Sequence, residues 1–248
     1  MKIKRISSTP TTGTTIGKVF GVSITALIES LRWAIMILPV ILSIPQLVHA
    51  AEPYTITEIS TYETIDDGID PPLASKAIAR FGPFAVTNAT TAELVDGTDS
   101  DSHNAFRAML AAYPQIRTIN MVECPGTLDD EVNLAIARAI RAKGINTHVP
   151  AGGSIRSGGV ELFLAGVKRT ADRGAEFGVH SWQDYDGHEA KDVAADDPVH
   201  ADYINYYKAM GLAPDIARAF YAFTNAAAPA NGVYYMTSAE LARFTIIN

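Results

Sequence analysis

Apolar residues in the second half of the chain recur alternately at strand and at helical spacing. Phe84–Val95 is rich in apolar and β-branched residues and predicts one strand, which ends at the turn Asp96-Gly97. Asp101-Ser102 then predicts the start of a helix, because capping residues precede Phe106, Met109 and Leu110 at helical spacing. That helix is expected to end near Pro114.

Three short apolar stretches follow and predict a β-α-β-α-β series. The predicted strands are Thr118–Cys124, Ile145–Val149 and Ala175–Val179. The helix between the first two is expected to begin with a capping box of Thr127 and Asp130, and the second helix to span residues 158–170. Strands joined by such crossovers run parallel, and ligands bind where their carboxyl ends meet. The predicted fold class is α/β, with a parallel sheet, flanking helices and a helical C-terminal part.

Three features of the sequence fall on that edge of the predicted sheet. Pro125-Gly126-Thr127 follows the first strand, Ser157-Gly158-Gly159 opens the helix after the second, and His180 closes the third. A serine at a helix start lies among free amides that stabilise an oxyanion, and a nearby histidine can take its proton. Each feature alone is typical of ordinary caps, turns and surface positions, so the hypothesis of a catalytic site depends on their convergence.

The same residues resemble a known family. Runs 119–127, 152–166 and 174–181 are similar to the ClpP/crotonase fold, and most similar to ClpP-like serine peptidases, including uncharacterised periplasmic ClpP-like proteins of bacteria. The resemblance covers residues 90–183 well. It implies that Ser157 is the nucleophile and His180 the general base. It also implies an oxyanion hole made by the amides of Gly126 or Thr127 and of Gly158, with Thr127 standing where the family has a second glycine.

The third catalytic residue departs from the family pattern. Residues 235–240 resemble the helix start that follows the peptidase acid, but Val233 occupies roughly the place of that acid. Asn231 is the nearest polar residue, and an asparagine orients an imidazole but stabilises imidazolium less well than a carboxylate does. The unplaced alternatives are Asp184, Asp186, Asp202 and Asp215. A Ser-His dyad and an inactive site both remain open.

The first fifty residues differ in kind from the rest. They hold five basic residues and one acid, together with an uncharged apolar run from Trp33 to Val48. The small residues before Ala51 predict a signal peptide cleaved after Ala50, and therefore a periplasmic or secreted protein. The alternative is an inner-membrane anchor through residues 33–48. Residues 51–80 are expected to form a lead-in segment and 81–248 the folded domain.

Composition narrows the classes of function. The chain has 48% hydrophobic and 19% charged residues, which is typical of a folded domain. The net charge of −7 argues against nucleic-acid binding, and a single cysteine excludes a disulfide framework or a cysteine-rich metal module. His188 and His200, with the acids near them, match no metal-ligand spacing, so neither a metal nor a cofactor is expected.

These observations favour an extracytoplasmic, ATP-independent serine hydrolase that acts on peptide or other acyl bonds. The alternatives are a non-catalytic binding or scaffold protein on the same fold, and a crotonase-like acyl-thioester enzyme. Aromatic residues between Tyr203 and Phe223 fall on a predicted helical pair, where they are typical of a core or a subunit interface. A homo-oligomer is expected, as is usual for ClpP-like folds.

Overall fold

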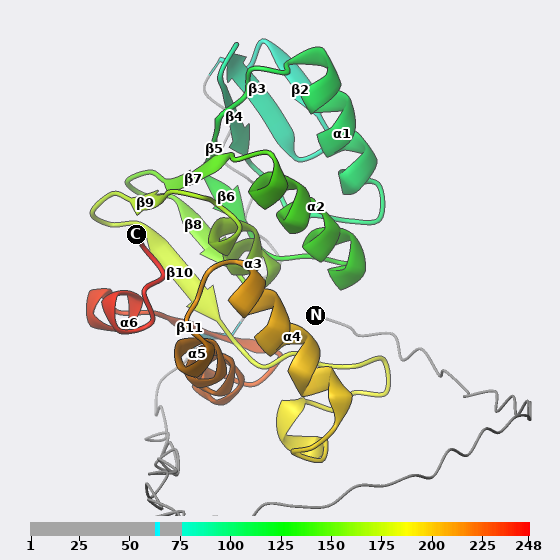
Figure 1. Ribbon diagram of the computed structural model, residues 1–248, viewed down its shortest axis with the longest axis vertical. Coiled ribbons are helices and arrows are strands. Elements are labelled where there is room, and N and C mark those ends of the chain that lie inside the picture. The colour runs from blue at the N-terminus through cyan, green and yellow to red at the C-terminus, as the bar shows by residue number, and fades with distance from the viewer. Residues whose placement is uncertain (1–62, 65–75) are drawn as a thin grey trace, which may run out of the picture. The chain divides into compact units, whose positions relative to one another are not determined.

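The fold contains two β-sheets, and the chain passes several times from a strand of one sheet directly into a strand of the other (Figure 1). The computed structural model describes residues 63–64 and 76–248, so the predicted signal or anchor segment and most of the lead-in lie outside the described residues. The six-stranded sheet has the order β2-β3-β4-β5-β7-β9, and the five-stranded sheet has the order β1-β11-β10-β8-β6.

The strands of the six-stranded sheet are β2 (Ala79–Phe81), β3 (Phe84–Asn88), β4 (Thr91–Leu94), β5 (Thr118–Met121), β7 (Asn146–Val149) and β9 (Arg169–Ala171). Those of the five-stranded sheet are β1 (Glu63–Thr64), β6 (Glu123–Cys124), β8 (Ser154–Arg156), β10 (Glu176–Val179) and β11 (Gly232–Tyr235). The pairs β4–β5, β5–β7 and β7–β9 are parallel, as are β6–β8 and β8–β10. The predicted parallel arrangement is confirmed.

The predicted strand Thr118–Cys124 is divided between the two sheets as β5 and β6, while the predicted strands Ile145–Val149 and Ala175–Val179 correspond to β7 and β10. The chain leaves β5 and enters β6 after one residue, Val122, and similar short bends join β7 to β8 and β9 to β10. The bend before β8 is tight, because a Cβ on Gly153 would lie 3.0 Å from the Met121 carbonyl oxygen. The prediction of one continuous strand over Thr118–Cys124 is therefore wrong.

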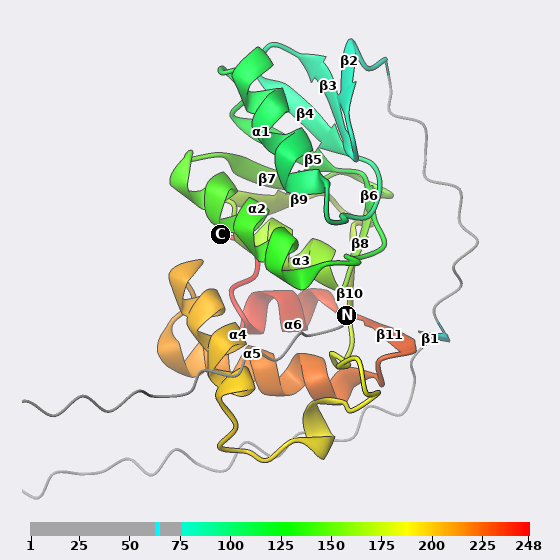
Figure 2. The same ribbon diagram turned by 90° about the vertical axis from the view of Figure 1, so that its right-hand side faces the viewer.

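The helices are α1 (Ser102–Ala112), α2 (Asp130–Ala142), α3 (Gly158–Leu164), α4 (Pro198–Ala209), α5 (Pro214–Ala227) and α6 (Ser238–Arg243), with a short 3-10 turn η1 (Ala190–Asp192). Helix α3 contacts α2 and strands β7, β8 and β10, while α4 packs on α5 (Figures 1 and 2). In the part of the chain that the structure describes, no helix combines the length and apolar character needed to cross a membrane.

Three local predictions need correction. Residues 84–95 form a hairpin rather than one strand, because the Asn88 side chain accepts hydrogen bonds from the amide and hydroxyl of Thr90 and closes a turn there. Helix α3 ends at Leu164 rather than near residue 170, because the Val167 amide bonds the Ile145 carbonyl and turns the chain toward β9. The cap of α2 is Asp129, whose carboxylate accepts from the Val132 amide; Thr127 does not cap it.

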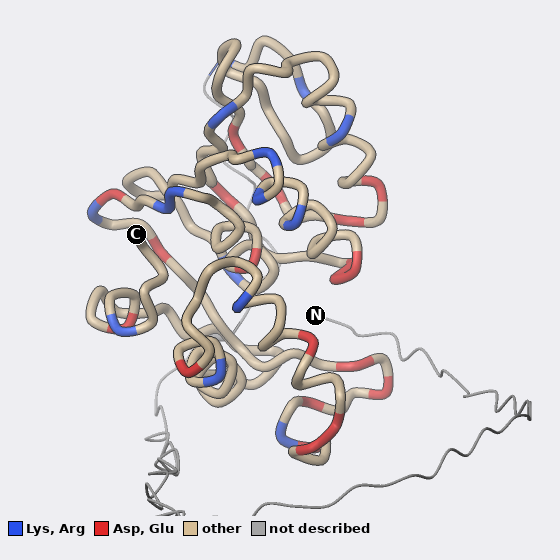
Figure 3. Tube along the Cα trace, in the orientation of Figure 1, with Lys and Arg blue, Asp and Glu red and all other residues tan. Residues whose placement is uncertain are grey.

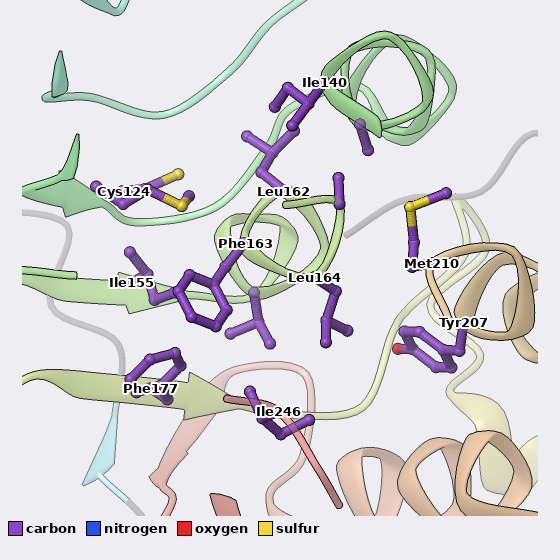
Figure 4. Close-up of a cluster of buried hydrophobic side chains, with 14 of the residues drawn as sticks. Cys124, Ile140, Ile155, Leu162, Phe163, Leu164, Phe177, Tyr207, Met210 and Ile246 are labelled. Atoms are coloured by element: carbon purple, nitrogen blue, oxygen red, sulfur yellow. The ribbon is translucent and has the colours of Figure 1, made fainter. Parts of the chain in front are cut away.

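The core surrounds helix α3, as the close-up of Figure 4 shows. Leu162, Phe163 and Leu164 are fully buried, and Phe163 packs edge-on against Phe177 of β10. The aromatic residues of α4 and α5 are part of the same core and not an exposed interface: Tyr203, Tyr206, Tyr207, Phe220, Tyr221 and Phe223 are all buried within the single chain. These aromatic residues therefore belong to the core of the chain and do not form an exposed surface.

Candidate active site

Ser157 stands at a sharp turn between the end of β8 and the start of α3. Its backbone has φ 51° and ψ −127°, a region that residues with a Cβ rarely occupy. The Ser157 side chain makes no capping hydrogen bond to α3, although it stands at the N-cap position. A strained strand-to-helix turn that presents an uncommitted hydroxyl is the geometry of a nucleophile elbow.

Glycines allow the neighbouring turn to approach this serine closely. A Cβ on Gly126, which has φ 139°, would lie 3.1 Å from the Ser157 Cβ and 3.5 Å from its Oγ. A Cβ on Gly158 would lie 2.7 Å from the Thr127 Cγ2, so only glycine fits there without a shift. The turn after β6 and the start of α3 are thus in direct contact beside the Ser157 hydroxyl.

The amides around Ser157 are available to a ligand. Among the described residues, the backbone N–H groups of Gly126, Thr127 and Gly158 have no hydrogen-bond acceptor within the protein. Thr127 instead uses its hydroxyl locally, accepting from the Asp129 amide and donating to the Asp129 carbonyl. The three amides that the resemblance implied as oxyanion donors therefore have no partner among the described residues, and Gly158 opens α3 at its positive dipole end.

A buried asparagine holds this arrangement together and was missed in the sequence. Asn133 of α2 is 1% exposed; it accepts a hydrogen bond of 2.8 Å from Thr98 Oγ1 and donates one of 2.9 Å to the Gly158 carbonyl. It therefore ties α2 and the Thr98 loop to the first turn of α3. A polar residue on the otherwise apolar face of Ile136 and Ile140 was the available signal.

His180 lies just beyond the carboxyl end of β10, where the sequence placed it. Its Nδ1 is 2.8 Å from the Ser181 carbonyl oxygen, and since a carbonyl only accepts, Nδ1 carries the proton and Nε2 is left as the acceptor. Burial lowers the pKa of His180, although the bond to Ser181 opposes that shift. The imidazole is therefore neutral at pH 7, as a general base must be.

Ser157 and His180 line the same cavity, which is partly open to solvent. No hydrogen bond joins these two side chains in the described part of the chain. The other lining residues are Glu161, Val179, Trp182, Tyr203, Tyr207, Tyr221, Thr224 and Asn225. Catalytic hydrogen bonds are often long before substrate binds.

Asn231 does not take the orienting role. It is exposed in the turn before β11 and does not line the cavity, and the His180 Nδ1 that it would orient is already bonded to the Ser181 carbonyl. Val233, in the place of the family's acid, is buried and pairs with Glu63 across β1 and β11. The four aspartates that the sequence left as alternatives, Asp184, Asp186, Asp202 and Asp215, do not line the cavity either.

The carboxyl group that does face the cavity is Glu161, one helical turn after Ser157. Its Oε1 accepts a hydrogen bond of 2.9 Å from the Tyr207 hydroxyl, while Oε2 is buried and has no hydrogen-bond partner in the part of the chain that the structure describes. Burial raises the pKa of Glu161 to about 7, although the Tyr207 bond opposes the shift. The sequence analysis did not identify Glu161; the available signal was a single acidic residue within the apolar run of Val160, Leu162 and Phe163.

A buried ion pair joins β8, the strand that precedes Ser157, to β6. Arg156 precedes Ser157 on β8, and its guanidinium contacts the Glu123 carboxylate of β6 and donates to Ser154 Oγ at 2.7 Å. Burial raises the pKa of Glu123, against the opposing effect of Arg156. Glu123 is thus a buried structural partner of Arg156 and not an exposed strand end.

The surface loop after β10 brings Asp184, Asp186 and His188 together, with ligand-type atoms within 4.8 Å of one another. The Asp184 carboxylate is already engaged there, since it accepts from the amides of Asp186 and His188 and contacts His188 Nδ1 at 3.1 Å. His200 lies apart, with Nδ1 2.6 Å from the Tyr221 hydroxyl. The polar groups of this surface loop thus bond to one another.

Comparisons with known proteins give distant similarities at the level of fold. No protein-family model matches the chain, and no curated protein matches it in sequence. One similar solved structure is a mutant of the membrane-bound stomatin-specific protease 1510-N in complex with a substrate peptide, with 16% identity, a TM-score of 0.44 and coverage of 64% of this chain and 74% of that one. Another is a probable enoyl-CoA hydratase/isomerase from Mycobacterium abscessus, with 12% identity, a TM-score of 0.41 and coverage of 68% of each chain. In the structure itself, the parallel strands and flanking helices agree with the α/β fold class predicted from the sequence.

Proposed function

We propose that the chain is a serine hydrolase that cleaves peptide or other acyl bonds through Ser157 and His180. The observation that carries this proposal is the strained turn at Ser157, with φ 51° and ψ −127° and no capping bond from the side chain. A fold keeps such a residue out of its favoured conformations at a cost of about 1–3 kcal/mol, and such positions cluster at functional sites. The unpaired amides of Gly126, Thr127 and Gly158 lie at the same turn.

The mechanism follows from these groups. The Ser157 Oγ attacks the substrate carbonyl carbon while its proton passes to His180 Nε2. The carbonyl oxygen becomes an oxyanion that accepts hydrogen bonds from the free amides. Collapse of this intermediate breaks the acyl bond, and His180 returns the proton to the leaving group. Water then hydrolyses the acyl-enzyme with His180 again as base.

The Ser181 carbonyl would replace the acid of a triad in this scheme. It fixes the imidazole with Nδ1 protonated, which leaves Nε2 as the nitrogen able to accept the serine proton. A carbonyl dipole stabilises the imidazolium less than a carboxylate, so we expect a slower enzyme than one with a full triad.

A non-catalytic binding protein is the second candidate. Two observations favour it: in the described residues, no hydrogen bond joins Ser157 to His180, and no carboxylate contacts the His180 ring. A crotonase-like acyl-thioester enzyme would need the oxyanion amides but no serine nucleophile. Like the binding protein, it would not be labelled by a serine-directed reagent.

A fluorophosphonate probe separates these functions. We expect covalent labelling of the purified full chain that is lost in Ser157→Ala and strongly reduced in His180→Ala. Ser154→Ala is the matched control, because Ser154 lies on the same strand with its hydroxyl bonded to Arg156. Labelling that persists in Ser157→Ala would identify a different nucleophile, and no labelling of the folded wild type would favour the binding protein.

We further propose that the protein acts outside the cytoplasm as a homo-oligomer. Cleavage after Ala50 predicts that protein from the host begins at Ala51, and an intact N-terminus in the membrane fraction would favour the anchor instead. Light scattering at micromolar concentration tests the proposed homo-oligomer, and a monomer under those conditions would contradict it.

A further inference from the structure

The cavity beside Ser157 has walls of an unusual kind for an acyl-binding pocket. Four aromatic side chains line it, Trp182, Tyr203, Tyr207 and Tyr221, together with the carboxyl group of Glu161. Aromatic faces attract cations, and a carboxylate is their natural counter-ion. A cavity for an aliphatic side chain would need neither.

Glu161 is held firmly in place. Its carbonyl oxygen accepts a hydrogen bond of 2.6 Å from the Tyr206 hydroxyl, and its Oε1 one of 2.9 Å from Tyr207. The residue is 7% exposed, and its Oε2 has no hydrogen-bond partner among the described residues. A buried carboxyl oxygen without a partner is costly, and that cost is recovered when a donor binds it. A hydrogen-bond donor that reached this oxygen would therefore be stabilised there.

The distance between Ser157 and the Glu161 carboxylate limits the size of a bound group. Glu161 follows Ser157 by four residues, so the two positions are roughly 6 Å apart along the axis of α3 and on the same face. The four-carbon stem of a lysine spans a similar distance between its backbone and its ammonium group.

The surrounding charge favours a cation as well. No lysine or arginine is among the residues that line the cavity in the described part of the chain. Asp130, at the start of α2, lies close enough for the charge of Glu161 to add to the effect of burial and raise its pKa to about 7. The loop between β10 and α4 is predominantly acidic, as the red segments of Figure 3 show, with five aspartates, one glutamate and one lysine from Asp184 to Asp197. Such a field attracts cationic substrates.

We propose that this cavity binds the cationic side chain of a lysine or arginine residue, with Glu161 as its counter-ion, so that the bond cleaved follows a basic residue. The inference rests on the proposed hydrolase function and names its substrate class. Trp182, Tyr203 and Tyr221 form the aromatic wall, and the Tyr207 hydroxyl holds the carboxylate toward the bound cation.

The test compares peptidyl-aminomethylcoumarin substrates that differ in the residue before the cleaved bond. With the full chain, kcat/KM for lysine is expected to exceed that for its uncharged analogue norleucine by about tenfold or more, with arginine also preferred. Glu161→Gln keeps the shape and an acceptor for Tyr207 but removes the charge, so the lysine-to-norleucine ratio is expected to fall by about tenfold. Glu176→Gln, at the exposed amino end of β10, is the matched control and should keep the wild-type ratio.

The two proposals fail differently in this experiment. If Ser157 is labelled by the fluorophosphonate but norleucine is cleaved as well as lysine, the cationic pocket is wrong and the hydrolase stands. If the protein neither labels nor cleaves, the hydrolase fails and the pocket assignment falls with it. Should Glu161→Gln not fold, inhibition of the wild type decides: butylammonium is expected to compete with substrate and butanol not to, and equal effects would overturn the inference.

Discussion

Replacing Ser157 with glycine should stabilise the protein while it removes the proposed nucleophile. The backbone at φ 51° and ψ −127° strains any residue with a Cβ, by about 1–3 kcal/mol. Glycine adopts that conformation freely, but it loses about 0.5–1 kcal/mol through the greater freedom of the unfolded chain. No capping hydrogen bond is lost, because the Ser157 side chain makes none. The net gain expected is about 1 kcal/mol.

Ser157→Ala is the matched control, since it removes the same hydroxyl but keeps the Cβ and hence the strain. Both variants should lose fluorophosphonate labelling. Equilibrium unfolding in urea, with unchanged m-values, should place Ser157→Gly above Ser157→Ala by about 1 kcal/mol, and the midpoint of thermal unfolding should differ by about 2–4 °C for a domain of this size.

The ranking of these two variants is the critical outcome. If Ser157→Gly is no more stable than Ser157→Ala, the turn holds no conformational strain and the main support for a nucleophile elbow is lost. If both variants unfold at the wild-type midpoint and keep labelling, the nucleophile itself has been misassigned.

Three further predictions follow from the same site. The lysine-to-norleucine ratio of kcat/KM should rise as pH increases through about 7 and then level off, because the Glu161 carboxyl, with a pKa of about 7, ionises there. This carboxyl faces Asp130 of α2 and Tyr207 of α4, whereas ionisation of His180 affects both substrates equally. A ratio that stays constant from pH 5.5 to 8.5 would contradict this prediction. Arg156→Met should lower the free energy of unfolding by about 3–5 kcal/mol, since it leaves Glu123 buried and unpaired, and adding Glu123→Leu should restore most of it; urea titrations that show no rescue would argue against the buried pair. Asn231→Ala should change kcat by less than about twofold, and a loss of several orders of magnitude would return that side chain to the catalytic unit.

Much of the site could be predicted from the sequence, because its residues stand at chain positions with local signals. A glycine turn after an apolar strand, Ser-Gly-Gly at a helix start and a histidine at a strand end each mark a boundary, and parallel topology brings such boundaries to one edge. The structure does place Gly126, Ser157 and His180 there. The alternation of elements likewise depends on local periodicity, and α1, α2, α4 and α5 lie close to their predicted positions.

The remainder depends on contacts between segments far apart in the chain. Nothing near Glu161 shows that Tyr206 and Tyr207, more than forty residues later, will hold its carbonyl and carboxyl oxygens. The role of Asn133 likewise requires knowing that Gly158 comes within 2.9 Å. The assignment of Asn231 failed for a related reason, because an orienting group was sought among side chains while the acceptor is the backbone carbonyl of Ser181.

The passage of three chain segments from one sheet into the other has a consequence for how the domain unfolds. Unfolding of one sheet must disturb the other, because the connections β5–β6, β7–β8 and β9–β10 are at most four residues long. The buried residues of both sheets also belong to one continuous core. Stability should therefore be shared across the junctions, so that backbone amides of Ile119 in one sheet and Ile155 in the other exchange their hydrogens with the same free energy of opening. The turn at Ser157 directly follows β8, so the cooperative stability of both sheets holds this serine in its strained conformation.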